Sequence, residues 1–285
     1  MPELPEIVCR SREMNELLRG RTIVRVEVRQ PKCLNVSVAA FAEAFEGATI
    51  GRTTVRGKWL VTETTGGALL INLGMGGELL FVDRDDLPEK WRVRFDLDGD
   101  KTLSVNFWWF GSTHLVPSGK LESEGPLTRL GPNALDIELT AFRRLLGGRR
   151  GRIKSFLLDQ KNVAGIGNAY VHDILFSAGL HPLRTIPTLS EAEIAELHRA
   201  IRAELKRSIK KGSASYEVGL LGQRGGFGAS DLRVGYREGE PCPQCGACVE
   251  KVKTGSTSSY VCPRCQPLDP GEANEESFEA VSHET

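Results

Sequence analysis

The chain has 285 residues, of which 40% are hydrophobic and 26% are charged, a composition typical of a soluble globular protein. Its length is sufficient for two domains with separate cores. The longest apolar stretch, residues 68–82, contains Asn72, Glu78 and several glycines, which excludes a transmembrane helix there. Because no basic segment followed by an apolar core stands at the start, we expect no secretory signal and a cytoplasmic, nucleoid-associated protein.

The net charge of zero hides an uneven distribution of charge along the chain. Residues 266–285 contain six acidic residues and no Lys or Arg, so residues 1–265 carry a net charge of +6. A basic body is compatible with nucleic acid as a partner. The Pro, Gly, Ser and Glu content of residues 267–285 predicts a disordered acidic tail. We expect this tail to aid solubility; the alternative is that it competes with DNA for the basic surface.

The first six residues, MPELPE, place a proline after the initiator methionine and two carboxylates close behind it. Removal of Met1 would leave Pro2 with a free amine of pKa about 8, part of which is nucleophilic near neutral pH. Such an amine can form a Schiff base with a sugar aldehyde carbon, and a nearby carboxylic acid can protonate the sugar oxygen. The simpler alternative is that Pro2 permits methionine removal and that Glu3 and Glu6 are favoured by the helix dipole. On the hexapeptide alone, the simpler alternative is favoured.

The N-terminal half of the chain is predicted to be mainly β-structure. Residues 5–19 are predicted to form a helix that ends at Gly20, and the spacing of Phe41 and Phe45 indicates a second, short helix. Strands are predicted at residues 24–28, 49–56, 58–63, 68–73, 78–82, 91–97 and 102–107, with a hairpin turn at Asp98-Gly99. Many short strands with tight turns indicate a sandwich or a barrel.

The pattern changes after residues 117–137, which are rich in Gly and Pro and are interpreted as a linker. The clearest helix is expected over residues 191–211, where apolar residues recur at helical spacing. Ser190 and Glu193 form the sequence pattern of a capping box at its start. The glycine-dense residues 222–228 are expected to form a flexible loop outside the core.

Gly165-Ile166-Gly167-Asn168, between two apolar segments, predicts a tight turn between two helices. Backbone amides at the start of the second helix can bind a phosphate, because glycines permit close approach. A plain helix hairpin is an equally good interpretation of this turn alone. The basic residues that precede it, Arg149, Arg150, Arg152 and Lys154, favour the nucleic-acid interpretation over a merely solvated face.

Four of the seven cysteines form two CxxC pairs separated by sixteen residues, namely Cys242, Cys245, Cys262 and Cys265. Four thiolates in two such turns suit a tetrahedral structural zinc ion, and the intervening residues are sufficient for two strands and a turn. Cys248 offers a competing CxxC pair with Cys245. Cys9 and Cys33 are isolated, and we expect them to be small buried hydrophobic residues.

These features together resemble the formamidopyrimidine-DNA glycosylase and endonuclease VIII family, and more closely its formamidopyrimidine branch. The resemblance spans residues 2–266 and rests on PELPE, on RGKWL around Lys58, on LLDQKNVAGIGNAYVHDILFSAGL over residues 157–180, and on the cysteine hairpin that ends in CPRCQ. It implies an α+β multidomain fold with an N-terminal β-sandwich and leading helix, a helix-two-turn-helix domain and a C-terminal zinc-finger hairpin, with DNA between the domains. We place these parts at residues 1–120, 138–228 and 229–266, with a linker at 121–137 and the tail at 267–285.

The resemblance implies a monomeric bifunctional DNA glycosylase and abasic-site lyase of base excision repair, with one structural zinc ion and double-stranded damaged or abasic DNA as its partner. Pro2 would attack the sugar C1′ of a nucleotide flipped out of the duplex, because that carbon cannot be reached inside the stack. Glu3 matches the acid that assists sugar opening, and Glu6 matches a second carboxylate of the site. The Schiff base acidifies the adjacent sugar protons, so β- and δ-elimination would follow base loss.

Further residues match DNA contacts of the family. Lys58 and Asn168 match phosphate contacts, and Gly167 and Lys154 belong to the same positively charged turn region. Two apolar residues would enter the stack: Met75 would fill the gap left by the flipped base, and Phe110 would act as a wedge. Core packing is the alternative for both of these apolar residues.

Three residues depart from the family pattern. Trp108 stands where the formamidopyrimidine branch has an arginine that reads the orphaned base, and tryptophan cannot present a bidentate donor fork. Thr257, five residues before the third zinc-site cysteine, replaces an arginine that grips phosphates, so lesion binding should weaken unless Lys251 or Lys253 substitutes. His172 replaces a small polar residue.

These departures leave alternative functions open. The chain could be specialised for unusual lesions, such as bulky or cross-linked bases, or it could bind damage without efficient catalysis. A generic zinc-ribbon interaction module ranks last, because it explains only residues 242–265.

Overall fold

The computed structural model of the protein describes residues 1–255 and 257–268. The predicted acidic tail therefore lies, from residue 269 on, outside the described residues. The chain divides into two compact units that do not follow chain order: Met1–Gly131 with Arg207–Gly228, and Pro132–Lys206 with the residues from Ala229 onward. Among the described residues, no helix is long and apolar enough to cross a membrane.

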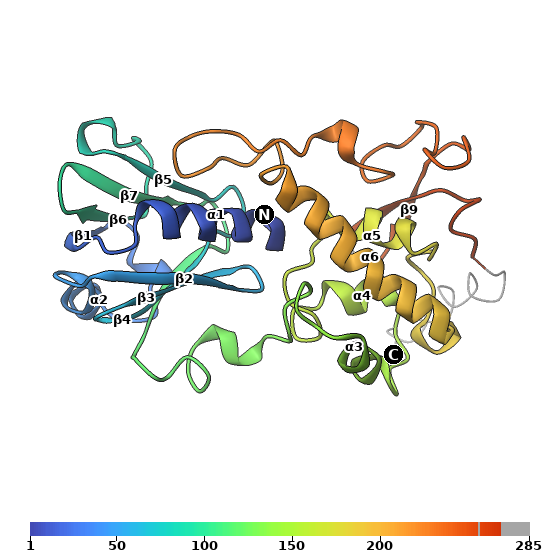
Figure 1. The fold of residues 1–285 in the computed structure, drawn as a ribbon, viewed down its shortest axis with the longest axis horizontal. Coiled ribbons are helices and arrows are strands. Elements are labelled where there is room, and N and C mark those ends of the chain that lie inside the picture. The colour runs from blue at the N-terminus through green and yellow to red at the C-terminus, as the bar shows by residue number, and fades with distance from the viewer. Residues whose placement is uncertain (256, 269–285) are drawn as a thin grey trace, which may run out of the picture. The chain divides into compact units, whose positions relative to one another are not determined.

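The first unit is a sandwich of two four-stranded antiparallel sheets. One sheet has the strand order β1 (Ile23–Val28), β6 (Val93–Leu97), β7 (Lys101–Asn106) and β5 (Glu78–Asp83). The other has the order β2 (Ile50–Arg56), β3 (Trp59–Thr64), β4 (Gly67–Asn72) and β8 (Ser112–Val116). Helix α1 (Leu4–Leu17) packs on β2 and β3, and α2 (Val38–Phe45) packs beside β1 (Figure 1). The predicted sandwich with a leading helix is confirmed, and β8 is a strand that the sequence analysis did not predict.

Apolar side chains from both sheets and both helices meet in one core. Phe41 and Phe45 of α2 are fully buried against Phe95 of β6, with ring centroids 6.1 and 6.3 Å from it. Leu220, from the late segment of the chain, is also fully buried in this core, and its carbonyl oxygen accepts a hydrogen bond from the Phe81 backbone at 2.7 Å. Residues 207–228 thus complete the first unit.

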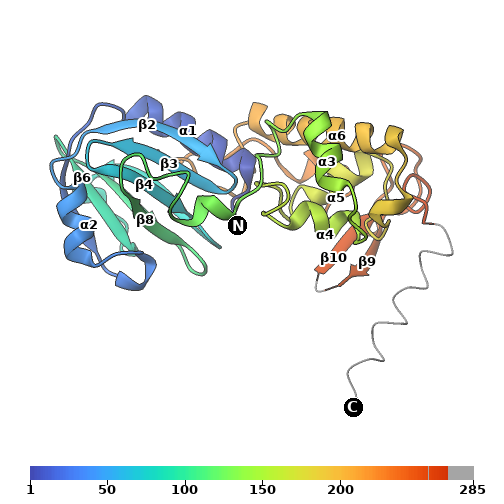
Figure 2. The same cartoon turned by 90° about the horizontal axis from the view of Figure 1, so that it is seen from below.

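The second unit is helical and ends in a β-hairpin. Its helices are α3 (Leu139–Leu146), α4 (Ile153–Leu158), α5 (Val171–Ser177) and α6 (Glu191–Lys210), the last of which runs on into the first unit, and the hairpin consists of β9 (Glu250–Thr254) and β10 (Thr257–Val261). Short 3-10 turns lie at Pro31–Cys33, Arg84–Asp86, Pro126–Arg129, Ile186–Thr188 and Ala229–Asp231. The hairpin lies beside α4 and α5 (Figure 2).

One sequence signal of the second unit has the expected hydrogen bonds, and a buried carboxylate that was not predicted anchors the loop before the hairpin. At the start of α6, the Ser190 backbone donates to Glu193 Oε2 at 2.7 Å, and the Glu193 backbone donates to Ser190 Oγ at 3.3 Å, which confirms the capping box. The residues before the hairpin are fixed by Asp173, whose carboxylate accepts from three consecutive backbone amides, those of Arg233, Val234 and Gly235. Burial raises the pKa of the Asp173 carboxyl group, while these three amides oppose that shift.

Candidate functional site

The N-terminus of the chain leads directly into helix α1, and Pro2 is buried. Glu3 and Glu6 are only 3% and 2% exposed. They form a capping box, in which the Glu3 backbone donates to Glu6 Oε2 at 2.9 Å and the Glu3 side chain accepts from the Glu6 backbone. Glu6 lies in the first turn, as the simpler alternative expects, whereas Glu3 is the N-cap residue. The same bonds hold both carboxylates next to Pro2.

One face of α1 holds a distant segment of the chain, residues 213–223, here called the pocket loop. Glu6, Arg10 and Glu13 are spaced at helical intervals, so their side chains share that face. Glu6 Oε1 accepts a hydrogen bond from the Ala214 backbone at 3.2 Å, and Arg10 donates one to the Val218 carbonyl. The Glu13 carboxylate accepts from the Leu220 backbone and from the Gln223 side chain, at 2.9 Å each. The helix that begins at Pro2 thus fixes the position of the pocket loop.

A cavity of about 610 Å³ lies beside the N-terminus and is here called the N-terminal pocket. Its lining consists of Met1, Gly76, Gly77, Glu78, Pro88, Glu89, Lys90, Asn106, Trp108, Tyr216, Glu217 and Val218. Because Met1 itself lines this cavity, removal of Met1 would leave the Pro2 nitrogen at the pocket wall. Sequence motifs did not point to Glu217 or to the other pocket-loop residues, since only the folded chain brings them to the N-terminus.

Glu217 is an unusual carboxylate within this pocket. Burial raises its pKa to about 7, and the nearby negative charges of Glu6 and Glu78 act in the same direction. The N-terminal ammonium and Arg10 act in the opposite direction. Part of the Glu217 population is therefore protonated at neutral pH.

Two loops of the sandwich carry exposed apolar side chains. Trp108, Trp109 and Phe110 are 69%, 67% and 80% exposed, and Met75 is 46% exposed. The Met75 backbone donates to the Trp109 carbonyl at 2.8 Å, and the Trp108 backbone donates to the Met75 carbonyl at 3.0 Å. Exposure on this scale excludes the core-packing alternative for Met75 and Phe110.

The close approach of these two loops depends on glycine. Gly74 has a φ of +54°, and a Cβ atom there would lie 2.2 Å from the Trp109 carbonyl oxygen. Phe110 also has a positive φ, of 60°, which is uncommon for a bulky residue and is often found at functional sites. The backbone thus holds these apolar side chains out toward solvent.

Lys58 lies in the turn that joins β2 and β3, and it is partly exposed. Asn72 links this turn to the Met75 loop, because its Nδ2 donates to the Lys58 carbonyl at 3.3 Å and its Oδ1 accepts from the Gly74 backbone at 2.9 Å. The first unit therefore joins the turn that carries Lys58 to the exposed apolar loops. Asn72 was not singled out from the sequence, since its role depends on contacts between two loops.

In the second unit, the predicted helix, turn and helix are present around residues 165–168. Gln160 supports the turn: its Oε1 accepts from the Gly165 backbone and its Nε2 donates to the Ile166 carbonyl, both at 2.8 Å. Gly167 is buried, whereas Asn168 is partly exposed. Asn168 Oδ1 has no hydrogen-bond partner among the described residues. That oxygen is buried and can only accept, so a phosphate contact of Asn168 falls to the Nδ2 donor of the same amide.

The four predicted zinc ligands, Cys242, Cys245, Cys262 and Cys265, have sulfur atoms that all lie within 4.8 Å of one another. Zinc–sulfur bonds of about 2.3 Å in a tetrahedron place sulfurs roughly 3.8 Å apart, so this donor set fits one structural zinc ion. Cys248 lies outside the group and is exposed, which excludes the competing pairing. The predicted hairpin between the two cysteine pairs is confirmed, and Cys9 and Cys33 are buried as expected.

Lys154 reaches from α4 to the zinc hairpin. It is 2% exposed, and its ammonium donates to Thr254 Oγ1 (3.0 Å), Thr257 Oγ1 (3.0 Å) and the Ser258 carbonyl (2.9 Å). Burial lowers the pKa of Lys154 to about 8. Thr257, where the family pattern has an arginine, thus accepts a hydrogen bond from a buried lysine. The Lys154 ammonium faces the hairpin, so Lys154 would affect DNA binding only through the position of the hairpin.

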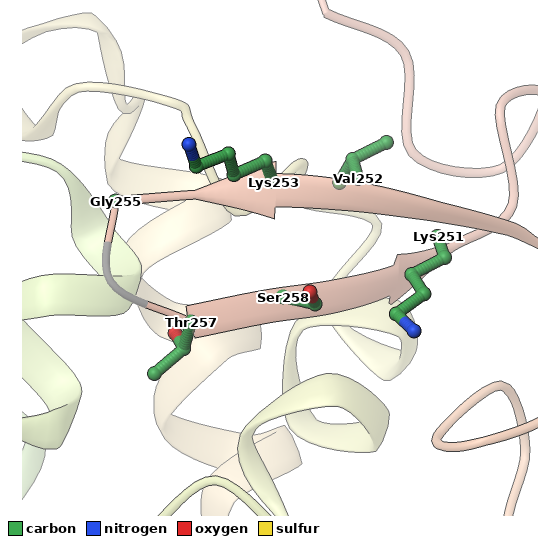
Figure 3. Close-up of a pocket in the computed structure, with 6 residues that line it drawn as sticks. All are labelled: Lys251, Val252, Lys253, Gly255, Thr257 and Ser258. Carbon is green, nitrogen blue, oxygen red and sulfur yellow. The ribbon is translucent and has the colours of Figure 1, made fainter.

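The exposed cations of the hairpin are Lys251 and Lys253, which line a groove of about 350 Å³ together with Val252, Gly255, Thr257 and Ser258 (Figure 3). The Lys251 side chain extends across β10, where its ammonium lies 6.0 Å from the Tyr260 ring centroid, and it also pairs with Glu238 at 3.9 Å. The Lys253 side chain extends away from β10. Of these two lysines, only Lys251 forms an ion pair with a described residue.

His172, the third departure from the family pattern, is 1% exposed and packs edge-on against Tyr236 and Tyr260, with centroids at 5.5 and 5.3 Å. Neither ring nitrogen has a hydrogen-bond partner among the described residues. Burial, with the charge of Lys154 as a second cause, lowers the pKa of His172 to about 3. This histidine is therefore neutral and joins α5 to the hairpin.

Family models match three parts of the chain. The formamidopyrimidine-DNA glycosylase N-terminal domain matches residues 1–107, the H2TH domain of the same glycosylases matches residues 130–218, and a zinc finger found in FPG and IleRS matches residues 239–268.

Similar curated proteins are the formamidopyrimidine-DNA glycosylases of Bacillus cereus (34% identity, covering 94% of this chain and 99% of the relative) and Symbiobacterium thermophilum (35%, 96% and 92%). Among solved structures, the chain is similar to Lactococcus lactis Fpg in complex with abasic-site DNA, with a TM-score of 0.87, 29% identity, and coverage of 93% of this chain and 100% of that chain. A complex of the Lactococcus lactis enzyme with N7-benzyl-Fapy-dG DNA has the same TM-score and identity, and covers 94% and 100%.

Proposed function

Because this chain belongs to the formamidopyrimidine-DNA glycosylase family, we propose that it is a bifunctional DNA glycosylase and abasic-site lyase of base excision repair. Its substrate is double-stranded DNA that contains an oxidised or ring-opened base or an abasic site. It acts in the cytoplasm, at the nucleoid. The observation that carries this proposal is the place of Pro2 in the chain, directly after Met1, which lines the N-terminal pocket, and directly before the helix start that holds two buried carboxylates.

The chemistry begins once Met1 has been removed and the Pro2 nitrogen carries a free electron pair. That nitrogen attacks the sugar C1′ while the bond from C1′ to the damaged base breaks. Glu3 gives a proton to the ring oxygen of the sugar, which opens the ring and leaves a Schiff base between Pro2 and C1′. Loss of a C2′ proton then expels the 3′ phosphate, and a second elimination expels the 5′ phosphate. Glu6 fixes the start of α1 and the pocket loop around these steps.

The DNA contacts of the proposal come from both units. Lys58 and Asn168 bind phosphates, and Gly167 allows the backbone near Asn168 to approach the strand. Met75 and Phe110 enter the base stack, which their exposure on glycine-rich loops supports. Trp108, which is 69% exposed, stacks on a base rather than pairing with one. Lys154 acts indirectly by supporting the zinc hairpin.

Reductive trapping tests the role of Pro2. Borohydride reduces a Schiff base to a stable amine, so protein incubated with an abasic-site duplex should form a covalent complex that maps to Pro2 by mass spectrometry. Pro2→Glu, in which a bulky second residue blocks methionine removal, should form at least 100-fold less complex, on the order of magnitude expected when a nucleophile is lost. Pro5→Ala, which changes a neighbouring proline and keeps the amine, serves as the control.

The same assay separates catalysis from damage binding. Tight binding to the abasic duplex without trapping or strand scission would favour a damage-binding protein and contradict the enzyme. An adduct that maps to a residue other than Pro2 would contradict the assignment of the nucleophile.

A further inference from the structure

The backbone of Glu217 is held in place by the fold, but its carboxyl group is not. The pocket loop is fixed to α1 on both sides of Glu217, at Ala214 by Glu6 and at Val218 by Arg10. The Glu217 backbone itself is held within the loop, because its amide donates to the Ala214 carbonyl at 3.0 Å. In contrast to this anchored backbone, the Glu217 carboxyl group makes no hydrogen bond or ion pair with the described residues, and Glu217 lines the N-terminal pocket.

Charged groups from several parts of the first unit surround the Glu217 carboxyl group. The charges of Glu6 and Arg10 on α1 and of Glu78 at the start of β5 act on it. The N-terminal amine lies close enough to act on its charge, and Glu89 and Lys90 line the same pocket. Burial is the main cause of the raised pKa of Glu217, and the charges around it partly cancel, so the carboxyl group keeps its proton more readily than an exposed one does.

A protonated carboxyl group presents a donor and an acceptor side by side. Its O–H can donate to a carbonyl oxygen or ring nitrogen of a base, while its C=O accepts from an adjacent N–H. The ionised group offers acceptors only. Trp108 and Tyr216 also line the pocket, and aromatic side chains can stack on a planar base.

We propose that Glu217 is a specificity-determining residue that, in its protonated form, hydrogen-bonds the extruded base in the N-terminal pocket. This inference rests on the proposed function. The inference adds to that function the side chain that recognises the base, and it makes this recognition depend on the protonation of Glu217.

Two substrates separate recognition of the base from the later chemistry, because only one of them carries a damaged base. Single-turnover cleavage is measured between pH 6 and 9 on a duplex carrying Fapy-dG and on an abasic-site duplex, and the ratio of the two rates is taken at each pH. The titration of Pro2 affects both rates and cancels in the ratio. For the unchanged protein, the ratio should fall above about pH 7, by about tenfold in all, because ionised Glu217 can no longer donate its hydrogen bond.

Variants test the donor directly. Glu217→Gln carries an amide that donates and accepts at every pH, so its ratio should be constant across the range. Glu217→Ala should lower the ratio at pH 6.5 by about tenfold, the usual effect of losing one good hydrogen bond. Glu16→Gln removes the same charge from the exposed face of α1 and should keep the pH dependence of the unchanged protein.

The outcomes are distinguishable. If the unchanged protein cleaves neither duplex, the proposed function fails. If it cleaves both but the ratio does not change with pH, or if Glu217→Gln lowers both rates equally, Glu217 does not read the base and the inference is overturned.

Discussion

At the scale of single residues, His172 shows what burial does to an ionisable side chain. The unfolded chain takes up a proton on this histidine below pH 6.5, whereas the folded chain does not do so until about pH 3. Folding stability should therefore decrease as the pH falls from 6.5, since the unfolded state then binds more protons. His172→Phe keeps a ring between Tyr236 and Tyr260 and removes the titration. Between pH 7 and 5.5, the unchanged protein should lose about 1 kcal/mol more than the variant.

Urea unfolding at both pH values, with zinc present, measures this difference. His172→Phe should also be at least as stable at pH 7, because it buries no unpaired ring nitrogen. Equal losses for the two proteins would show that the histidine is not kept neutral by the fold.

Residues whose chemistry is local could be predicted from the sequence. The paired cysteines and the Ser190 capping box each lie within a few positions of their partners, so spacing alone identifies them. Glu217 and Asn72 could not be found in this way, because their surroundings are assembled from loops that are far apart in the chain. The functional residues of the N-terminus were interpretable mainly through the family resemblance.

At the scale of secondary-structure elements, β1 was predicted because valines and charged residues alternate along it, and most other strands of the sandwich were predicted as short runs bounded by turns. Strand β8 (Ser112–Val116) was missed for a physical reason. One of its buried residues is Thr113, which is polar and fully buried, so the apolar alternation is absent. Only pairing with β4 makes this segment a strand.

The zinc hairpin depends on an element outside it, because Lys154 of α4 donates three hydrogen bonds to β9 and β10. Lys154→Met keeps an unbranched chain of similar length and removes all three bonds. We expect a loss of roughly 1–3 kcal/mol in the free energy of unfolding, the usual cost of leaving a buried polar partner unsatisfied.

Chemical denaturation monitored by circular dichroism measures this loss. Lys253→Met, an exposed lysine of the same hairpin, is the matched control and should change stability by no more than about 0.5 kcal/mol. If both variants were equally stable, the bonds of Lys154 would contribute little to the fold.

At the scale of the whole molecule, the zero net charge is the sum of a body with a charge of +6 and a C-terminal segment with a charge of −6. If the segment serves solubility alone, deleting residues 267–285 should leave the affinity for an abasic duplex at 50 mM salt within about twofold, as judged by fluorescence anisotropy. A markedly higher affinity, with a steeper dependence on salt, would indicate that the segment competes with DNA for the body.

The discontinuous make-up of the first unit has a consequence for how the protein matures. A ribosome releases the chain from its N-terminus at about 5–20 residues per second, and domains usually fold as they emerge. Here Leu220, which completes the core beside Phe81, is translated only after most of the second unit. A nascent or truncated polypeptide that stops before residue 207 lacks the wall of the pocket and the partners of Glu6, Arg10 and Glu13. Incomplete products therefore lack the N-terminal pocket, which is finished only when synthesis has passed residue 223.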